Sequence, residues 1–461
     1  MTQLAGRGRS LGLKLLLVGA LVLALGLPLG MVNILAWERE NRAGQVAGDV
    51  GAALGGPQTV RGPFLVIPVD VAVVIETARG EEVVRSESVQ RQYVILSPDT
   101  LDVAAQLETR ILRRAIYTVP GYQASVSLSG TFNLDGIDAL TPANGTLQWD
   151  EAQVFVLVSD LRGIAEDFDA RVSTGAEPLS FEPGLAFRRN HDAASFGATV
   201  ARGVSAGVEG LEGNGEFTFE GRLVLIGASS FSIQPSGRET RTQISGDWAH
   251  PGFAGAYLPG TREVSETGFS AAWLVPYLAR GFPARWVEGQ GYALSNADQA
   301  VMTVNLVNPA DGYARVSRSL KYAFFFVGFT LLMFFLIEAS SDQRLHSAQY
   351  ILIGLAQVVF YLLLLALSEH AGIALGFSIA AGATVVLTAL YAWAAFRNNA
   401  RAMLTFAALT VSYMVQFLLV LVEDYALLIG SALAFLAVAA TMYVTRKIDW
   451  YAQEERPGSS S

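Results

Sequence analysis

The sequence predicts an integral membrane protein with an N-terminal transmembrane helix, a large all-β, sandwich-like extracytoplasmic domain and a C-terminal bundle of five transmembrane helices. The 461-residue chain is 52% hydrophobic and only 16% charged, whereas about a quarter of a soluble chain is charged. Charged residues are sparse in residues 11–36 and 320–445, which contain apolar runs of membrane-spanning length. Residues 37–319 show short β-branched runs separated by turn residues.

Residues 1–10 are predicted to be a short cytoplasmic N-terminus, and residues 11–36 to be the first transmembrane helix. A cleavable signal peptide is the alternative interpretation. Its apolar region would be about 7–15 residues long and would end in a small-residue cleavage site. The apolar run here is longer and ends in Leu35-Ala36-Trp37, a poor cleavage site. We therefore expect a retained membrane anchor.

The region 37–319 is expected to form antiparallel β-sheets. Apolar runs such as FLVIPV (64–69), YVIL (93–96) and VFVLV (154–158) alternate with turn pairs such as Pro-Gly, Asn-Gly and Pro-Asp. Residues 270–280 could form a short helix limited by Pro276. The region is longer than a typical single core, so one or two sandwiches remain open.

The remaining chain contains five further apolar segments of membrane length. They are residues 322–337, 348–367, 372–396, 402–422 and 425–444, and the polar residues 446–461 follow as a tail. Charged residues occur only between these five segments. We therefore predict six membrane-spanning helices in total.

The distribution of basic residues predicts the orientation. Lysine and arginine near the ends of membrane helices prefer the cytoplasm. They occur at alternate ends of the predicted spans: Arg7, Arg9, Lys14, Arg397, Arg401, Arg446 and Lys447. The other two connections carry Glu369-His370 and Glu423-Asp424 and no basic residue. Both termini are thus expected in the cytoplasm and the β-domain on the outer side of the membrane.

Three basic residues disagree with this orientation. Arg315, Arg318 and Lys321 lie at the predicted outer end of residues 322–337. A long translocated domain largely escapes the charge rule, so the orientation above is retained.

Several long strings resemble the CreD family of bacterial inner-membrane proteins. In the C-terminal part they are QYILIGL (349–355), FYLLLL (360–365), LSEH (367–370), EDYALLIGS (423–431) and TRKIDWY (445–451). In the β-domain they are RGP (61–63), VSDLRG (158–163) and LPGTR (258–262). The resemblance implies an inner-membrane protein associated with envelope integrity and with a regulon under a two-component sensor. It implies no catalytic residue.

The composition excludes several kinds of chemistry. Residues 37–319 carry 22 arginines and 33 acidic residues, and this acidic balance argues against nucleic acid as a partner, because phosphate binding needs a basic surface. The absence of cysteine excludes thiolate sites, and the presence of only four histidines argues against a zinc cluster. The β-domain has only His191 and His250, and no nucleophile elbow accompanies them. Asp160 and Arg162 are expected on one face of a strand, as an ion pair. We expect no enzyme activity and no cofactor.

Two groups in the predicted bundle are candidate functional residues. Gln357 and Gln416 are polar residues in the middle of spans, and interhelical hydrogen bonding is favoured over a substrate path. Ser368, Gly372, Gly376 and Ala380 are spaced four apart and are expected on one face of the fourth predicted helix, which predicts close helix packing rather than an oligomer interface.

The third candidate is an outer-face polar site formed by Glu369, His370, Glu423 and Asp424. If the two connections are adjacent, these side chains could bind a cation or respond to pH. The simpler interpretation is that connections outside a bilayer must be polar.

The preferred function is that of a non-enzymatic inner-membrane protein whose periplasmic β-domain binds an envelope component, either a protein or a glycan or lipid component. The alternative is a transporter or lipid-handling protein in which the five-helix bundle provides the pathway. The bilayer is a partner in both.

Overall fold

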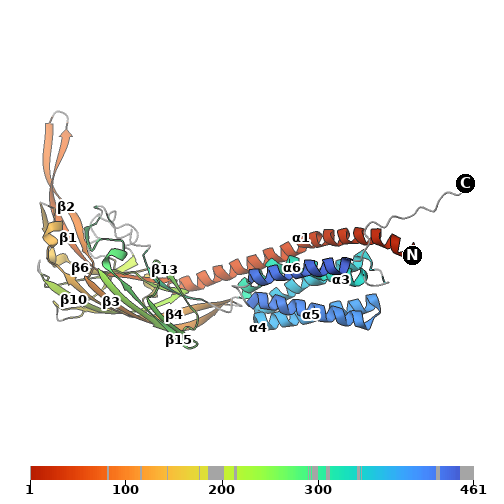
Figure 1. The fold of residues 1–461 in the computed structure, drawn as a ribbon. Helices are drawn as coiled ribbons and strands as arrows, with labels where there is room; N and C mark the ends of the chain where they lie inside the picture. Colours follow the sequence, from red (N-terminus) through yellow and green to blue (C-terminus); the bar gives the residue numbers. More distant parts are fainter. Residues whose placement is uncertain are drawn as a thin grey trace. The chain divides into compact units, whose positions relative to one another are not determined.

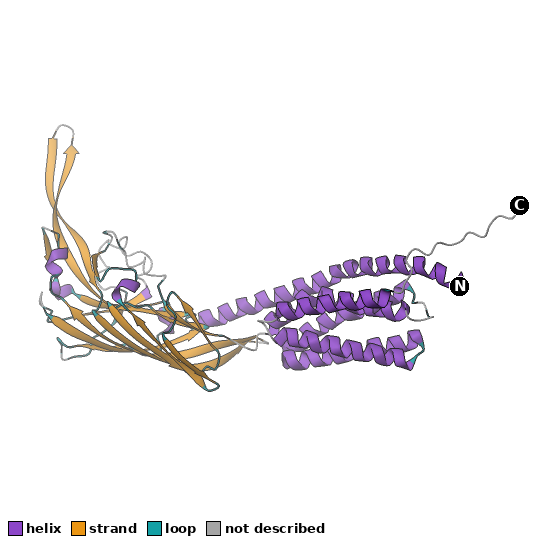
Figure 2. Ribbon diagram, in the orientation of Figure 1, coloured by secondary structure: helices purple, strands orange, loops and turns teal. Residues whose placement is uncertain are grey.

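The computed structural model describes residues 2–79, 82–114, 117–142, 144–175, 177–184, 202–211, 215–288, 290, 292, 300–307, 312–339, 343, 345–421 and 426–446. The chain divides into two compact units, Met1–Gly44 with Ala310–Ser461, and Gln45–Pro309. The first unit is helical and the second is built mainly of β-strands (Figures 1 and 2). The predicted fold class, an apolar N-terminal helix, a central all-β region and a C-terminal apolar helical region, is confirmed.

Helix α1 (Thr2–Ala53) continues well past residue 36, where the sequence predicted the end of the first span. Residues 37–53 contain glutamate, arginine, glutamine and alanine and no proline, and these residues favour a helix. The helix ends before Gly55 and Gly56, whose φ angles of 90° and 64° favour glycine.

In the described part of the chain, the β-region is followed by α3 (Gly312–Ala339), α4 (Ser347–Phe396), α5 (Asn399–Leu421) and α6 (Ala426–Thr445). By length and composition, α1, α3, α4 and α5 can each cross a membrane, and α6 contains a shorter apolar stretch at Gly430–Tyr443.

The long element α4 is a helical hairpin. Its backbone is non-helical at Gly372, where φ is 77° and ψ is 165°. A Cβ atom on Gly376 would lie 2.8 Å from the backbone nitrogen of Ser368, a contact that a straight helix cannot make. The rings of Phe360 and Phe377 are also only 5.4 Å apart. The chain therefore reverses at Gly372, between the predicted segments 348–367 and 372–396.

Helices α1, α3, α4 and α5 share one apolar core. Buried residues of α1, including Leu25, Leu29 and Val32, join the cluster formed by α3, α4 and α5. Leu25 lies against Gly354 of α4, where a Cβ atom would be only 2.2 Å from its side chain. The N-terminal helix is thus packed against the C-terminal helices.

The β-region contains two sheets. The ten-stranded sheet has the order β13-β17-β11-β1-β6-β9-β8, with β5 and β2 paired to β1 and β16 paired to β2. Its strands are β1 (Gln58–Arg79), β2 (Glu82–Leu96), β5 (Gly145–Leu147), β6 (Gln153–Val158), β8 (Glu182–Pro183), β9 (Gly203–Gly207), β11 (Ser230–Ile233), β13 (Pro251–Gly255), β16 (Arg285–Val287) and β17 (Met302–Leu306).

The seven-stranded sheet has the order β14-β15-β12-β3-β4-β10-β7. Its strands are β3 (Thr100–Arg114), β4 (Tyr117–Asn133), β7 (Asp169–Val172), β10 (Glu216–Ala228), β12 (Glu239–Gly246), β14 (Thr261–Ser265) and β15 (Gly268–Val275). Short 3-10 helices in the described connections are Ile137–Leu140, Trp149–Glu151, Leu161–Gly163 and Tyr277–Ala279.

The two sheets enclose one core, so the region is a single sandwich. Burial alternates along β3, and its inward residues Leu101, Val103 and Leu107 join Leu65 and Ile67 of β1 in one cluster. The expected short helix at residues 270–280 is wrong for residues 270–275, which belong to β15, and only Tyr277–Ala279, after Pro276, form a 3-10 helix. Alternating burial there fits a strand, and β15 pairs with both β12 and β14.

Candidate functional site

The predicted outer-face polar site is only partly described, because Glu423 and Asp424 lie outside the described residues. Glu369 accepts a hydrogen bond from the Tyr313 hydroxyl at 3.2 Å, and one of its carboxylate oxygens lies 3.9 Å from Nε of Arg39. His370 is exposed, with Nδ1 3.2 Å from the carbonyl oxygen of Ala366. Among the described residues, no group of three or more His, Asp or Glu could hold a metal ion. In the described part, Glu369 therefore contacts a basic side chain and a tyrosine of its own unit.

Gln357 and Gln416 lie in the bundle core and form hydrogen bonds between helices. The Tyr413 hydroxyl donates to Oε1 of Gln357 at 2.8 Å. Nε2 of Gln416 lies 2.6 Å from the Tyr361 hydroxyl and 3.2 Å from the Ser319 hydroxyl. These bonds connect α3, α4 and α5 through side chains that are almost completely buried. The sequence offered no signal that Tyr361 and Tyr413, which lie within the predicted segments 348–367 and 402–422, would be the partners of the two glutamines.

The expected single face of small residues is wrong, because the helix is interrupted at Gly372. Ser368 and Gly376 instead lie on opposite arms of the α4 hairpin and meet across it. Gly376 is required for this approach, since a side chain there would collide with the backbone of Leu367 and Ser368. Gly372 supplies the turn, and its positive φ explains the glycine.

A buried ion pair connects α1 with α3. Nζ of Lys14 donates to Glu338 and also to the carbonyl oxygen of Leu345, at 2.9 Å from the latter. The Tyr350 hydroxyl donates to the second carboxylate oxygen of Glu338 at 2.7 Å. Glu338 is only 4% exposed. Sequence reasoning missed this cluster because Glu338 directly follows the predicted segment 322–337 and Lys14 was interpreted only as an orientation signal.

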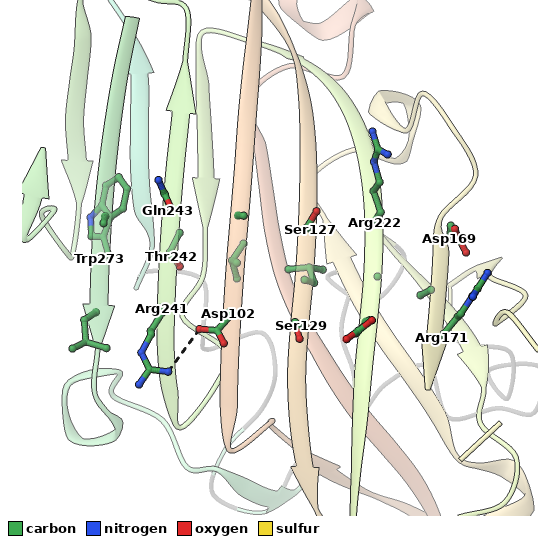
Figure 3. A pocket seen from close by; sticks show the side chains of 18 of the residues that line it. Asp102, Ser127, Ser129, Asp169, Arg171, Arg222, Arg241, Thr242, Gln243 and Trp273 are labelled. Atoms are coloured by element: carbon green, nitrogen blue, oxygen red, sulfur yellow. Dashed lines mark ion pairs between the residues drawn. The ribbon is translucent and has the colours of Figure 1, made fainter. Parts of the chain in front are cut away.

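The β-sandwich carries a hollow of about 880 Å³ on the outer face of the seven-stranded sheet (Figure 3). Strand register aligns its outward side chains in two rows across the sheet. The first row is Leu274, Arg241, Asp102, Ser129, Glu220 and Arg171, and the second is Ala272, Gln243, Ala104, Ser127, Arg222 and Asp169. Alternate residues of every strand face the core, so the residues between them face outward and form these rows.

The hollow has a floor of small residues and charged sides. Ala104, Ser127 and Ser129 occupy its centre on β3 and β4. Arg241 and Asp102 lie 3.8 Å apart on one side, while β7 and β10 carry further charges of both signs on the other. Figure 3 shows these charged side chains on either side of the two serines. An extended polar ligand could therefore approach the strand backbones closely and meet charges at both sides.

No catalytic group is assembled around the remaining sequence candidates in the described part of the chain. His250 is exposed, and Asp247 accepts the backbone N–H of Thr109 at 2.8 Å. His191 lies outside the described residues. Asp160 and Arg162 form the expected ion pair, at 2.6 Å. Residues 161–163 form a 3-10 helix rather than a strand, with Asp160 as its N-cap, and hydrogen bonds from Arg162 lower the pKa of Asp160.

A second ion-pair group lies at the base of the β1–β2 hairpin. Arg91 Nε donates to Asp70 at 2.8 Å across the two strands, and Arg91 Nη1 donates to Glu151 at 2.7 Å. The hydrogen bonds from Arg91 lower the pKa of Asp70. This group fixes the hairpin against the 3-10 helix Trp149–Glu151.

Comparison with known proteins gives a match over nearly the whole chain. The family model described as "Inner membrane protein CreD" matches residues 10–451. Inner membrane protein CreD of Escherichia coli (strain K12) is 31% identical over 437 residues, which cover 95% of this chain and 92% of that protein.

Proposed function

The chain belongs to the CreD family of inner-membrane proteins, and we propose that it supports envelope integrity by binding an envelope component on the outer face of its seven-stranded sheet. In this proposal both termini are cytoplasmic, the sandwich is periplasmic, and the protein has no catalytic activity of its own. The hollow on the sheet is the observation that carries it.

The side chains of the hollow favour a polar, extended ligand. The small floor formed by Ala104, Ser127 and Ser129 leaves room for a ligand backbone, and the serine hydroxyls can donate and accept hydrogen bonds. Charges of both signs at the sides would recognise a ligand that itself carries both signs, such as a segment of another envelope protein. Complementary charges contribute specificity more than affinity.

The bundle core supports an anchoring role over an ion pathway. Gln416 and Tyr361 hydrogen-bond to each other, and Oε1 of Gln357 accepts from Tyr413, so most of these mid-helix polar atoms are bonded within the protein. Nε2 of Gln357 is buried and has no hydrogen-bond partner among the described residues. The charged pair Lys14–Glu338 is also internally bonded. An ion pathway would need such groups to bind the ion instead. The alternative of lipid handling has separate support, because apolar hollows lie on the exterior of the helices.

The proposal is tested by envelope permeability in a deletion strain that carries full-length variants. Ala104→Trp fills the floor of the hollow, and Ala72→Trp places the same exposed aromatic on β1, outside the hollow. Both proteins must reach the membrane in normal amounts. We expect dye and detergent resistance to be restored by the wild type and by Ala72→Trp, and to be lost with Ala104→Trp. Full restoration by Ala104→Trp would exclude the hollow as the binding surface.

A further inference from the structure

A second hollow, of about 370 Å³, lies between α3 and α5. One wall consists of Phe325, Phe326 and Phe329 on α3. The opposite wall on α5 includes the small residues Ala407, Ala408 and Ser412. Small side chains opposite phenylalanine rings leave the space between the two helices unfilled.

The dimensions and exposure of this crevice fit a lipid acyl chain. Its α5 wall runs from Leu404 to Val415, which is about 16 Å at the helical rise per residue. Half of the hydrocarbon core of a bilayer is about 15 Å thick. Leu404 and Val411 are 56% and 60% exposed, so the crevice opens to the surroundings of the helices and not into the bundle core.

Two basic residues lie at one end of this crevice. Arg318, Lys321, Phe325 and Phe329 follow one another at intervals of three or four residues on α3, so they lie on the same side of the helix. Nη1 of Arg318 donates to the carbonyl oxygen of Val420 at 3.1 Å, which holds the guanidinium beside the end of α5. Lys321 is exposed.

We propose that this crevice binds one anionic phospholipid, with an acyl chain between α3 and α5 and the phosphate between Arg318 and Lys321. Charge complementarity selects an anionic lipid, because two cations meet a headgroup where the apolar wall ends. The proposal also gives a reason for the basic residues at this end of α3, which disagree with the charge rule for orientation. It is independent of ligand binding by the β-sandwich.

The test is native mass spectrometry of the full chain in a neutral detergent. Phosphatidylglycerol and phosphatidylcholine with identical acyl chains are offered at equal concentration, and glycerol phosphate is offered separately. We expect one phosphatidylglycerol to be retained in preference to phosphatidylcholine. Lys321→Gln should lower that preference about fivefold, the contribution of one cation near a membrane surface. Ala408→Leu, which fills the crevice, should abolish it.

Matched controls separate this site from general lipid adhesion. Ala383→Leu adds the same bulk at an exposed position of α4 outside the crevice, and Arg397→Gln removes an exposed cation beyond the far end of α4. Both should retain the lipid as the wild type does. Equal retention of the two lipids, retention that persists in both Ala408→Leu and Lys321→Gln, or equal binding of glycerol phosphate would overturn the proposal. A wild-type dimer that becomes a monomer in Ala408→Leu would instead indicate a helix of a second copy as the occupant.

Discussion

The β-sandwich and the helix bundle place their polar side chains in opposite ways. In the sandwich, β3 directs Asp102 and Ala104 outward and Val103 into an apolar core. In the bundle, Leu352 and Leu362 of α4 are exposed, while Gln357 and Tyr361 on the same helix are buried. The sandwich therefore has the side-chain distribution of a protein in water, and the bundle has that of a protein in lipid.

This difference indicates what stabilises each region. Removal of apolar surface from water contributes about 25 cal/mol per Å² and drives the sandwich core together. Lipid is as apolar as leucine, so helices in a bilayer associate through close packing and interhelical hydrogen bonds. The Gly354–Leu25 contact and the Gln416–Tyr361 hydrogen bond are examples of these two interactions in the bundle.

The largest expected effect comes from replacing one buried phenylalanine by alanine in each region. Phe132 in the sandwich and Phe360 in the bundle are both fully buried, and each contacts other aromatic rings. Phe132→Ala should lower the free energy of unfolding by about 4 kcal/mol, from lost transfer and a cavity. Phe360→Ala should cost about half of that, because its unfolded state remains in lipid.

These two losses are measured by urea unfolding followed by tryptophan fluorescence for Phe132→Ala, and by detergent-induced unfolding for Phe360→Ala. Losses of equal size would show that the two cores do not differ in driving force as proposed.

The buried ion pair gives the next largest effect, and it should be asymmetric. Lys14→Ala leaves the nearly buried carboxylate of Glu338 without its cation, which should cost about 3 kcal/mol of bundle stability. Glu338→Leu should cost less, because Lys14 is 27% exposed and can extend its ammonium group toward water. The double variant Lys14→Met with Glu338→Leu should recover most of the loss. Equal destabilisation by the two single changes would contradict this interpretation.

The architecture could be predicted because the length of an apolar run and the spacing of apolar residues within it are visible in the local sequence. The apolar runs correspond to helices of α1, α3, α4 and α5, and the β-branched runs correspond to strands such as β6 and β10. Boundaries were less predictable. Residues 37–53 are more polar than the apolar run before them and yet continue the helix, so the end of the apolar run did not mark the end of the helix.

The candidate sites were predicted only in part, because they depend on contacts between distant segments. Lys14 and Glu338 are 324 residues apart in sequence, and no local sequence pattern predicts their pairing. The two glutamines were visible as polar residues within apolar segments, but their tyrosine partners were not. The two rows of the hollow depend on strand order and register, which short alternating patterns do not specify.

The smallest expected effect is the pH dependence of the Asp70–Arg91 pair on the sandwich. Hydrogen bonds from Arg91 lower the pKa of Asp70 in the folded state, so the pair stabilises the fold above the unfolded pKa of about 4. That contribution is lost as the pH falls through the lower, folded pKa. Asp70→Asn should therefore reduce stability at pH 7 by less than about 1 kcal/mol, and the difference from the wild type should vanish in strong acid.

Urea unfolding between pH 7 and pH 3 measures this difference, with Asp102→Asn as the control. Asp102 and Arg241 are both about 60% exposed and lie 3.8 Å apart, so solvent screens their attraction and the substitution should change little at any pH. If Asp70→Asn and Asp102→Asn lose the same stability at pH 7, the hydrogen-bonded pair Asp70–Arg91 stabilises the sandwich no more than the exposed pair Asp102–Arg241 does. If only Asp70→Asn responds, the polar exterior of the sandwich contains at least one pair that stabilises it, as the buried pair Lys14–Glu338 is expected to do in the bundle.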